Sequence, residues 1–270
     1  MSEIGFPPDA STEFNEFYNF LDKEYLDIKE SLKDADLNPQ DFIRRESNRQ
    51  NDIELPLFKI DSIHFFEDYI QNLFISLSEE FMANNKGNIE LKDFFKKMKS
   101  DPSKIQKILK DYMNGKIDKD IDISAEFLNS ISIYLLRPFF SWISSNINNF
   151  DSMTDTWFKN YCPFCGSQAD LGYLSNEEGQ KYLWCSLCGT DWRYHRFACP
   201  HCENVTADGS NYFTIKGSPY KVDLCNNCDN YFKVVDERKL PEEKRFLNSW
   251  SINDLICLHL DEIARREGHN

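Results

Sequence analysis

The chain has 270 residues and a formal net charge of −14, with 45 acidic side chains against 31 Lys and Arg. A surface this acidic repels phosphate backbones and anionic lipid, which argues against a nucleic-acid-binding protein. Hydrophobic residues make up 41% and include 22 Phe, so the chain can bury a core and general disorder is excluded. At about 100–200 residues per domain, the length suggests two or three domains.

No stretch approaches the roughly 18 consecutive apolar residues of a membrane span, so none is expected. The first residues lack the basic start and apolar run of a secretory signal. We therefore expect a cytoplasmic protein. In that reducing compartment, nine cysteines favour metal ligands or redox thiols over structural disulfides.

The first 150 or so residues contain no cysteine, and their apolar residues recur at steps of three and four, as one face of a helix does. Ser62 is expected to cap one of these helices, and Pro138 to kink another because proline removes a backbone donor. Core packing accounts for all these apolar faces. The spacing predicts helices over residues 14–32, 62–81, 91–98, 105–112 and 124–147.

Near Tyr161 the character changes to cysteine, glycine and short strand-like runs, and helical spacing returns over 246–263. We therefore predict an α + small β fold. Strands are expected at 172–174, 181–184, 192–197, 211–215 and 231–235. The predicted division is a helical domain (1–155), a first ribbon (156–192), a second ribbon (193–236) and a C-terminal helix (237–270).

Eight of the nine cysteines form four Cys-x-x-Cys pairs. Two intervening residues let the chain turn tightly and present both sulfurs to one ion, and tetrahedral zinc or rubredoxin-type iron needs two such pairs. The eight candidate metal ligands are Cys162, Cys165, Cys185, Cys188, Cys199, Cys202, Cys225 and Cys228.

Loop lengths indicate which pairs share an ion. Cys165 and Cys185 are separated by 19 residues, and Cys202 and Cys225 by 22, each enough for a strand–turn–strand hairpin. Only ten residues separate the second pair from the third, which suggests a connector. Consecutive pairing is therefore preferred, and an interleaved arrangement (first with third, second with fourth) stays open.

Two features of the pairs leave their chemistry open. A Cys-x-x-Cys pair can also cycle as a redox dithiol, although four pairs on hairpins fit metal better. Thiolates suit both zinc and iron, so two ions of either metal are expected.

Gly166 and Gly189 follow the first two pairs, as a left-handed turn prefers, whereas Glu203 and Asp229 follow the last two. That difference predicts a less regular geometry in the second ribbon.

Other polar residues near the pairs carry weaker predictions. Trp192, Arg193 and Arg196 lie in the only basic and aromatic cluster of the cysteine-rich region and are candidate partner-binding residues. His195 and His201 are candidate hydrogen-bond donors beside the metal ligands, and Cys257 has no partner cysteine nearby. No phosphate-binding loop, catalytic triad order or zinc-protease motif is present, so we expect a binding protein and not an enzyme.

Four segments together resemble the formate dehydrogenase accessory proteins of the FdhE family. They are Cys-Pro-Phe-Cys-Gly-Ser from residue 162, the run 179–192 containing Tyr-Leu-Trp-Cys-Ser-Leu-Cys, Arg-Phe-Ala-Cys-Pro-His-Cys-Glu-Asn from residue 196, and Cys-Asn-Asn-Cys from residue 225. Arg137–Pro138 before the pairs and Asp261–Glu262 near the end also match, so the resemblance covers about 137–268. Lys181 stands where the family more usually has arginine.

The resemblance implies a helical domain followed by two tandem rubredoxin-like (zinc-ribbon) modules. It also implies a maturation factor, chaperone-like in action, that binds the catalytic subunit of a molybdenum- or tungsten-dependent formate dehydrogenase. Iron and redox sensitivity at the ribbons are associated with the family, which suggests that oxidation releases the client. Two other hypotheses remain: a zinc-ribbon regulator of nucleic acid and a rubredoxin-like electron carrier.

Overall fold

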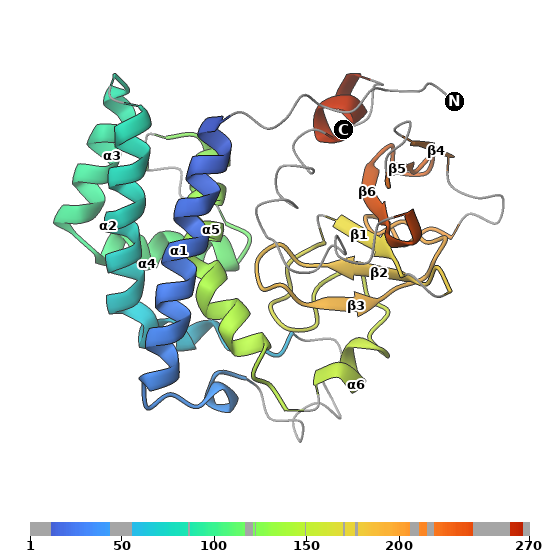
Figure 1. Cartoon of the computed structure of the whole chain (residues 1–270), viewed down its shortest axis with the longest axis horizontal. Helices are drawn as coiled ribbons and strands as arrows, with labels where there is room; N and C mark the ends of the chain where they lie inside the picture. The colour runs from blue at the N-terminus through green and yellow to red at the C-terminus, as the bar shows by residue number, and fades with distance from the viewer. Residues whose placement is uncertain are drawn as a thin grey trace.

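The computed structural model of the protein describes residues 12–43, 56–85, 87–116, 121, 123–148, 150–169, 171–175, 178–205, 211–214, 219–239 and 260–266. Helices fill one side of the molecule and a sheet the other (Figure 1). The helices are α1 (Thr12–Asp34), η1 (Pro39–Phe42), η3 (Ile60–Phe66), α2 (Glu67–Asn84), α3 (Ile89–Ser100), α4 (Ser103–Met113), α5 (Ala125–Ser144) and α6 (Phe150–Thr154).

These helices confirm the predicted helical N-terminal region, with one local difference at Ser62. Ser62 does not cap a helix: it lies inside the 3-10 turn η3, which leads into α2, and Lys59 occupies the cap position. Pro138 lies within α5 without ending it. Ser124 caps α5 by accepting a hydrogen bond from the backbone N–H of Phe127. Within the described residues, no helix has both the length and the apolar character for a bilayer crossing.

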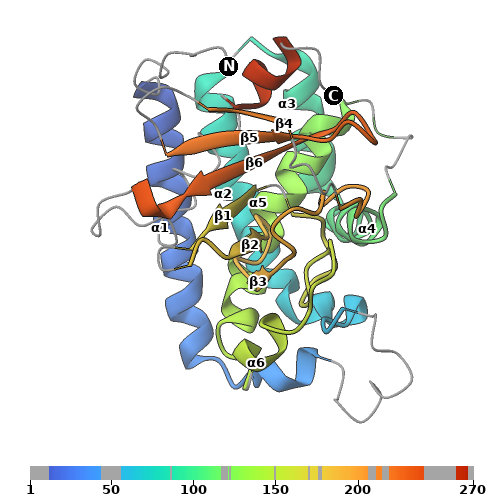
Figure 2. The ribbon, with the colours of Figure 1, turned by 90° about the vertical axis from the view of Figure 1, so that its right-hand side faces the viewer.

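The two ribbons share one six-stranded sheet in the order β3-β2-β1-β6-β5-β4 (Figure 2). Every strand pair is antiparallel except β1–β6, which joins the ribbons in parallel, with Leu171 opposite Lys233. The strands are β1 (Leu171–Leu174), β2 (Lys181–Trp184), β3 (Asp191–Arg193), β4 (Asn211–Thr214), β5 (Tyr220–Leu224) and β6 (Tyr231–Asp236).

Two strand predictions need correction. The run predicted as a strand over 192–197 ends at Arg193, because the chain turns there toward the third cysteine pair. Strand β5 was not predicted, since its sequence, Tyr-Lys-Val-Asp-Leu, carries two charges. Those two charges, on Lys221 and Asp223, form an ion pair with each other at 2.8 Å.

The core runs without interruption from the helices into the first ribbon. Phe58 from the helical side packs on Phe140 of α5 and on Phe164 between the first two cysteines, with ring centroids 4.4 and 5.6 Å apart. The backbone N–H groups of Leu57 and Phe58 donate to the carbonyls of Pro163 and Phe164. The helices therefore bind the first cysteine turn through both backbone and side chains. The domain boundary at residue 155, between the helical domain and the first ribbon, stays a prediction.

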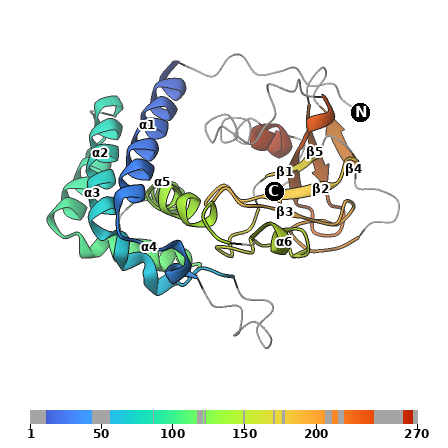
Figure 3. The same ribbon diagram turned by 60° about the horizontal axis from the view of Figure 1, so that its bottom comes forward.

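Helix α5 holds the second cysteine turn in the same way. Buried Arg137, 2% exposed, donates from Nε to the carbonyl of Ser186 at 2.9 Å, and Ser144 Oγ donates to the carbonyl of Cys188 at 2.9 Å. Helix α6 lies beside β3 at the edge of the sheet (Figure 3). The helical side thus covers one end of the first ribbon.

The second ribbon has a smaller core of its own. Phe213 and Val222 pack against Leu260, Ile263 and Ala264 of the C-terminal helix, and all five are buried. Residues 260–266 are the described part of that helix, and the rest of the stretch predicted over 246–263, with Cys257, lies outside the described residues. The fold class is therefore confirmed: a helical region, two cysteine ribbons and a C-terminal helix.

Arg137→Met should lower the free energy of unfolding by about 2 kcal/mol, because a hydrogen bond from a charged donor to a buried carbonyl is lost. Urea denaturation of the metal-loaded protein measures it. The control Arg266→Met removes an exposed ion pair with Glu262 and should cost about 0.5 kcal/mol or less. Equal effects of the two substitutions would contradict the anchoring role of Arg137.

Candidate metal centres

Each Cys-x-x-Cys segment folds into a turn with the same two backbone hydrogen bonds. In the first turn, Gly166 N–H donates to the carbonyl of Cys162 at 3.0 Å, and Cys162 N–H donates to the carbonyl of Ser167 at 2.8 Å. The same bonds, between 2.8 and 3.0 Å, recur in the turns that begin at Cys185, Cys199 and Cys225. Both sulfurs of a pair therefore face one side of the turn.

The last residue of each turn is left-handed whether or not it is glycine. Gly166 and Gly189 have φ of 82° and 75°, and Glu203 and Asp229 have φ of 58° and 57°. The prediction of a less regular second ribbon is therefore wrong: the turn geometry is kept, at a cost of about 1–2 kcal/mol for a side chain in this region. Asp tolerates the conformation better than Glu.

The structure brings the eight cysteines into two groups of four, in the consecutive pairing. Within each group all four sulfurs lie within 4.8 Å of one another. In the first group, Cys162 lies 3.4 Å from Cys188 and Cys165 lies 3.5 Å from Cys185. In the second, the distances are 3.8 Å for Cys199–Cys228 and 3.7 Å for Cys202–Cys225.

These distances fit a metal ion. A tetrahedral site with metal–sulfur bonds of about 2.3 Å places its sulfurs about 3.8 Å apart. Four thiolates select zinc or iron over hard cations such as Mg²⁺. Each group is thus a candidate tetrahedral site that closes around one ion, and a closed site of this kind stabilises a fold. The sulfur geometry is common to zinc and iron.

The two sites differ in burial. Cys162, Cys185 and Cys188 of the first site are buried, whereas Cys225 is the one buried member of the second. Burial raises the pKa of Cys185 and Cys188 well above the usual thiol value. Burial also opposes ionisation of Cys165, but hydrogen bonds from neighbouring thiols, Cys162 first, outweigh it and lower the pKa of Cys165 well below that value. A bound cation would therefore displace protons from the first site.

In the second site the sulfurs also ionise unequally. Burial raises the pKa of Cys199 to about 12. Burial also opposes ionisation of Cys202, but hydrogen bonds from the Asn204 backbone, the Asn227 side chain and the neighbouring thiols together outweigh it and lower the pKa of Cys202 to about 7. Asn227 Nδ2 lies 3.5 Å from Cys202 Sγ, and His201 N–H donates to Cys199 Sγ at 3.4 Å. These hydrogen bonds therefore favour the thiolate form of Cys202.

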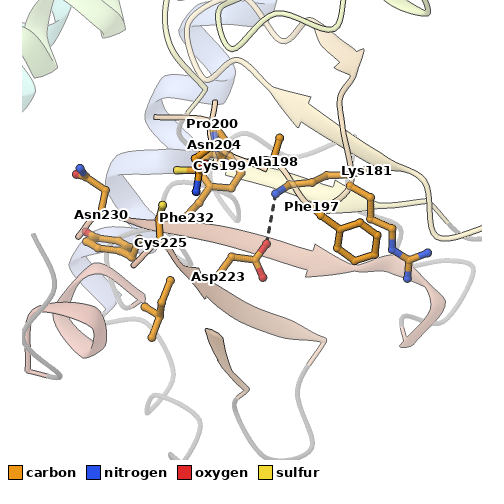
Figure 4. Close-up of a pocket in the computed structure, with 13 residues that line it drawn as sticks. Lys181, Phe197, Ala198, Cys199, Pro200, Asn204, Asp223, Cys225, Asn230 and Phe232 are labelled. Carbon is orange, nitrogen blue, oxygen red and sulfur yellow. Dashed lines mark hydrogen bonds and ion pairs between the residues drawn. The ribbon is translucent and has the colours of Figure 1, made fainter. Parts of the chain in front are cut away.

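A buried ion pair joins the two ribbons beside the second site. Lys181 on β2 lies 3.3 Å from Asp223 on β5, and their side chains are 3% and 10% exposed. Lys221 also pairs with Asp223, at 2.8 Å. Burial lowers the pKa of Lys181, and the carboxylate of Asp223 opposes this effect. Figure 4 shows the pair in a pocket that also contains Cys199 and Cys225.

The predicted partner-binding residues occupy different environments. Trp192 is fully buried, and its Nε1 donates to the carbonyl of Lys159 at 2.8 Å. It therefore packs in the core, where it is not exposed to a partner, unlike the prediction. Arg193 and Arg196 are exposed. His195 stacks on Phe158, and the His201 ring donates to the carbonyl of Tyr231.

Comparisons with known proteins match this region. The family model described as "FdhE, central domain" matches residues 161–196, the segment that contains the first site. "Protein FdhE homolog" of Aquifex aeolicus is 33% identical over 159 residues, which is 54% of this chain and 53% of the relative. "Protein FdhE" of Escherichia coli K12 is 30% identical over 115 residues, 41% of this chain and 35% of the relative.

The cysteine-rich region of the chain is therefore similar to the FdhE proteins. The matched region spans about half the length of the Aquifex relative and a third of the Escherichia relative. The fold agrees along nearly the whole chain: the crystal structure of the FdhE protein from Pseudomonas aeruginosa superposes with a TM-score of 0.58 at 15% identity, covering 96% of this chain and 91% of that chain. The FdhE fold therefore includes the helical region as well as the ribbons.

Glu203→Gly should raise the free energy of unfolding by about 1 kcal/mol, because glycine removes the left-handed strain of Glu203. Gly166→Ala should lower it, since the added Cβ would meet Pro56 Cγ at 2.6 Å and the residue has positive φ. Urea denaturation of metal-loaded protein compares the two. A loss of stability in Glu203→Gly would contradict the shared turn geometry.

The zinc-loaded protein should release about two ions per chain to a chromogenic chelator, in two kinetic phases. The more exposed second site should give the fast phase. Cys228→Ser should remove that phase, and Cys162→Ser the slow one. A fast phase that survives in Cys228→Ser would contradict the assignment.

Proposed function

We propose that this protein is a member of the FdhE family: a cytoplasmic accessory factor that binds the catalytic subunit of a molybdenum- or tungsten-dependent formate dehydrogenase and supports its assembly. It acts by binding and is not itself a dehydrogenase. One observation carries the proposal: the segment that matches the FdhE central domain forms the first four-sulfur cluster, and the chain continues into a second.

The four-sulfur clusters suit a binding role. When bound, the metal would cross-link two turns of each ribbon through Cys162, Cys165, Cys185 and Cys188, or through Cys199, Cys202, Cys225 and Cys228. Such cross-links hold the surface of a small ribbon in place, which reduces the ordering cost of binding another protein. Four protein ligands leave no position for a substrate at a tetrahedral ion.

Redox control follows from the same ligands. Oxidation of neighbouring thiolates to disulfides removes the ligands and frees the metal, and four sulfurs within 4.8 Å of one another place each cysteine close to a disulfide partner. The ribbon surface then loses its cross-link. We propose that the reduced, metal-loaded protein binds the client and that oxidation releases it.

An anaerobic pull-down tests the function. The reduced, metal-loaded protein should recover a formate dehydrogenase catalytic subunit, and Cys188→Ser and Cys228→Ser should lose it because each site then lacks a ligand. Cys257→Ser, at the cysteine outside the four pairs, is the matched control and should bind like wild type. Absence of the subunit from the wild-type eluate would refute the function. Client affinity unchanged after air oxidation would refute redox release alone.

A further inference from the structure

Three arginines gather where the two ribbons meet, at the turn between β1 and β2. An ideal Cβ built on Gly179 would lie 2.8 Å from Nη1 of Arg238 and 3.5 Å from Nη1 of Arg196, so both guanidinium groups lie over this glycine. Arg193 reaches the next residue, donating from Nη2 to Oε1 of Gln180 at 3.3 Å. We call Arg193, Arg196 and Arg238 the arginine patch.

Two members of the arginine patch have no carboxylate partner among the described residues. Neither Arg193 nor Arg196 forms an ion pair within the part of the chain that the structure describes. Arg238 is held by Asp236, which accepts from Nε at 2.7 Å and from Nη2 at 2.8 Å. Asp223, which lies at the junction of the two ribbons, is paired with two lysines.

An exposed apolar surface adjoins the arginine patch. Phe197 is 56% exposed, and the guanidinium of Arg196 lies 5.8 Å from the centre of its ring. From these two residues a pocket continues along the seam to Phe232, Pro200 and Cys199 of the second site (Figure 4). Cations, an aromatic side chain and an apolar pocket therefore follow one another across a few residues.

We infer that the arginine patch, Phe197 and the adjoining pocket bind an extended acidic segment of the client subunit. This inference rests on the proposed function and names the surface through which it acts. Guanidinium groups bind carboxylates through paired hydrogen bonds, so Arg193 and Arg196 take the acidic side chains. An apolar side chain of the same segment lies against Phe197 at the mouth of the pocket.

Charge complementarity selects this occupant. The unpaired guanidinium groups attract carboxylates, whereas the net charge of −14 opposes binding of an acidic segment to the chain as a whole, so the attraction has to come from a local group of cations. The pocket wall includes Cys199 and Cys225, so a client bound here touches the second metal site directly. Loss of that metal would then remove the wall of the binding surface.

Client affinity of the full metal-loaded chain tests the inference, by anaerobic biolayer interferometry with immobilised formate dehydrogenase catalytic subunit. Arg193→Glu with Arg196→Glu should weaken binding by about tenfold or more, and Phe197→Ser should also weaken it. Matched controls lie on exposed positions of α3: Lys96→Glu with Lys97→Glu for the charge change, and Ile89→Ser for the apolar residue. These should bind within about twofold of wild type.

Metal content and circular dichroism are measured on every variant, and Arg196→Lys supplies a variant that keeps the charge. It should bind between wild type and the double variant, because lysine lacks the paired donors. A synthetic peptide of four Glu-Gly-Phe-Ser repeats should compete with the client for the wild-type protein. The matched peptide with Gln in place of Glu should not.

The possible results separate this inference from the proposed function. Normal client binding by the double variant overturns the inference and leaves the function standing. Equal weakening by the α3 controls overturns it as well, since the effect would then belong to net charge. A wild-type protein that fails to bind the client overturns both. Self-association that the double variant abolishes, seen by light scattering without client, would identify a second copy as the occupant and overturn the client assignment.

Discussion

The attachment of the first cysteine ribbon to the helices is the constraint on which the rest of the structure depends. Arg137 and Ser144 of α5 donate to carbonyls of the second cysteine turn, and Leu57 and Phe58 donate to carbonyls of the first. A small ribbon has little core of its own, so this contact supplies the buried surface that it lacks. The first metal site is thus part of the main core.

The second ribbon is attached less directly. It joins the first through the parallel pairing of β1 with β6, through Phe232 and Val234 of β6, which lie in the main core, and through the buried pair Lys181–Asp223. Its own smaller core is the contact with residues 260–266. Its sulfurs are also more exposed. Loss of a bound metal would therefore affect the two ribbons differently, because helical packing also supports the first ribbon, whereas the second would rely more on its ion.

The sequence predicts what is local in this fold. Cys-x-x-Cys spacing and loop length identify both four-cysteine groups because each turn and hairpin is a short-range feature. The sequence does not predict the β1–β6 pairing, because residues about 60 positions apart must meet. It does not predict strand β5 either, because the charged residues of β5 resemble those of a loop until Lys181 is placed beside Asp223. The basic neighbours of Trp192 suggest an exposed position, but burial of its large side chain is more favourable than exposure to water. The left-handed Glu203 is tolerated because the turn's hydrogen bonds outweigh its strain.

The central claim is that the second site is supported chiefly by its metal, whereas the first is supported by the helices. Amide hydrogen exchange of Cys228→Ser, compared with wild type under anaerobic, metal-replete conditions, tests it most directly. The account predicts faster exchange in the second ribbon and in residues 260–266, with α5 and the first ribbon as protected as in wild type. Equal loss of protection in α5 would contradict it, because the two sites would then be parts of a single cooperative unit.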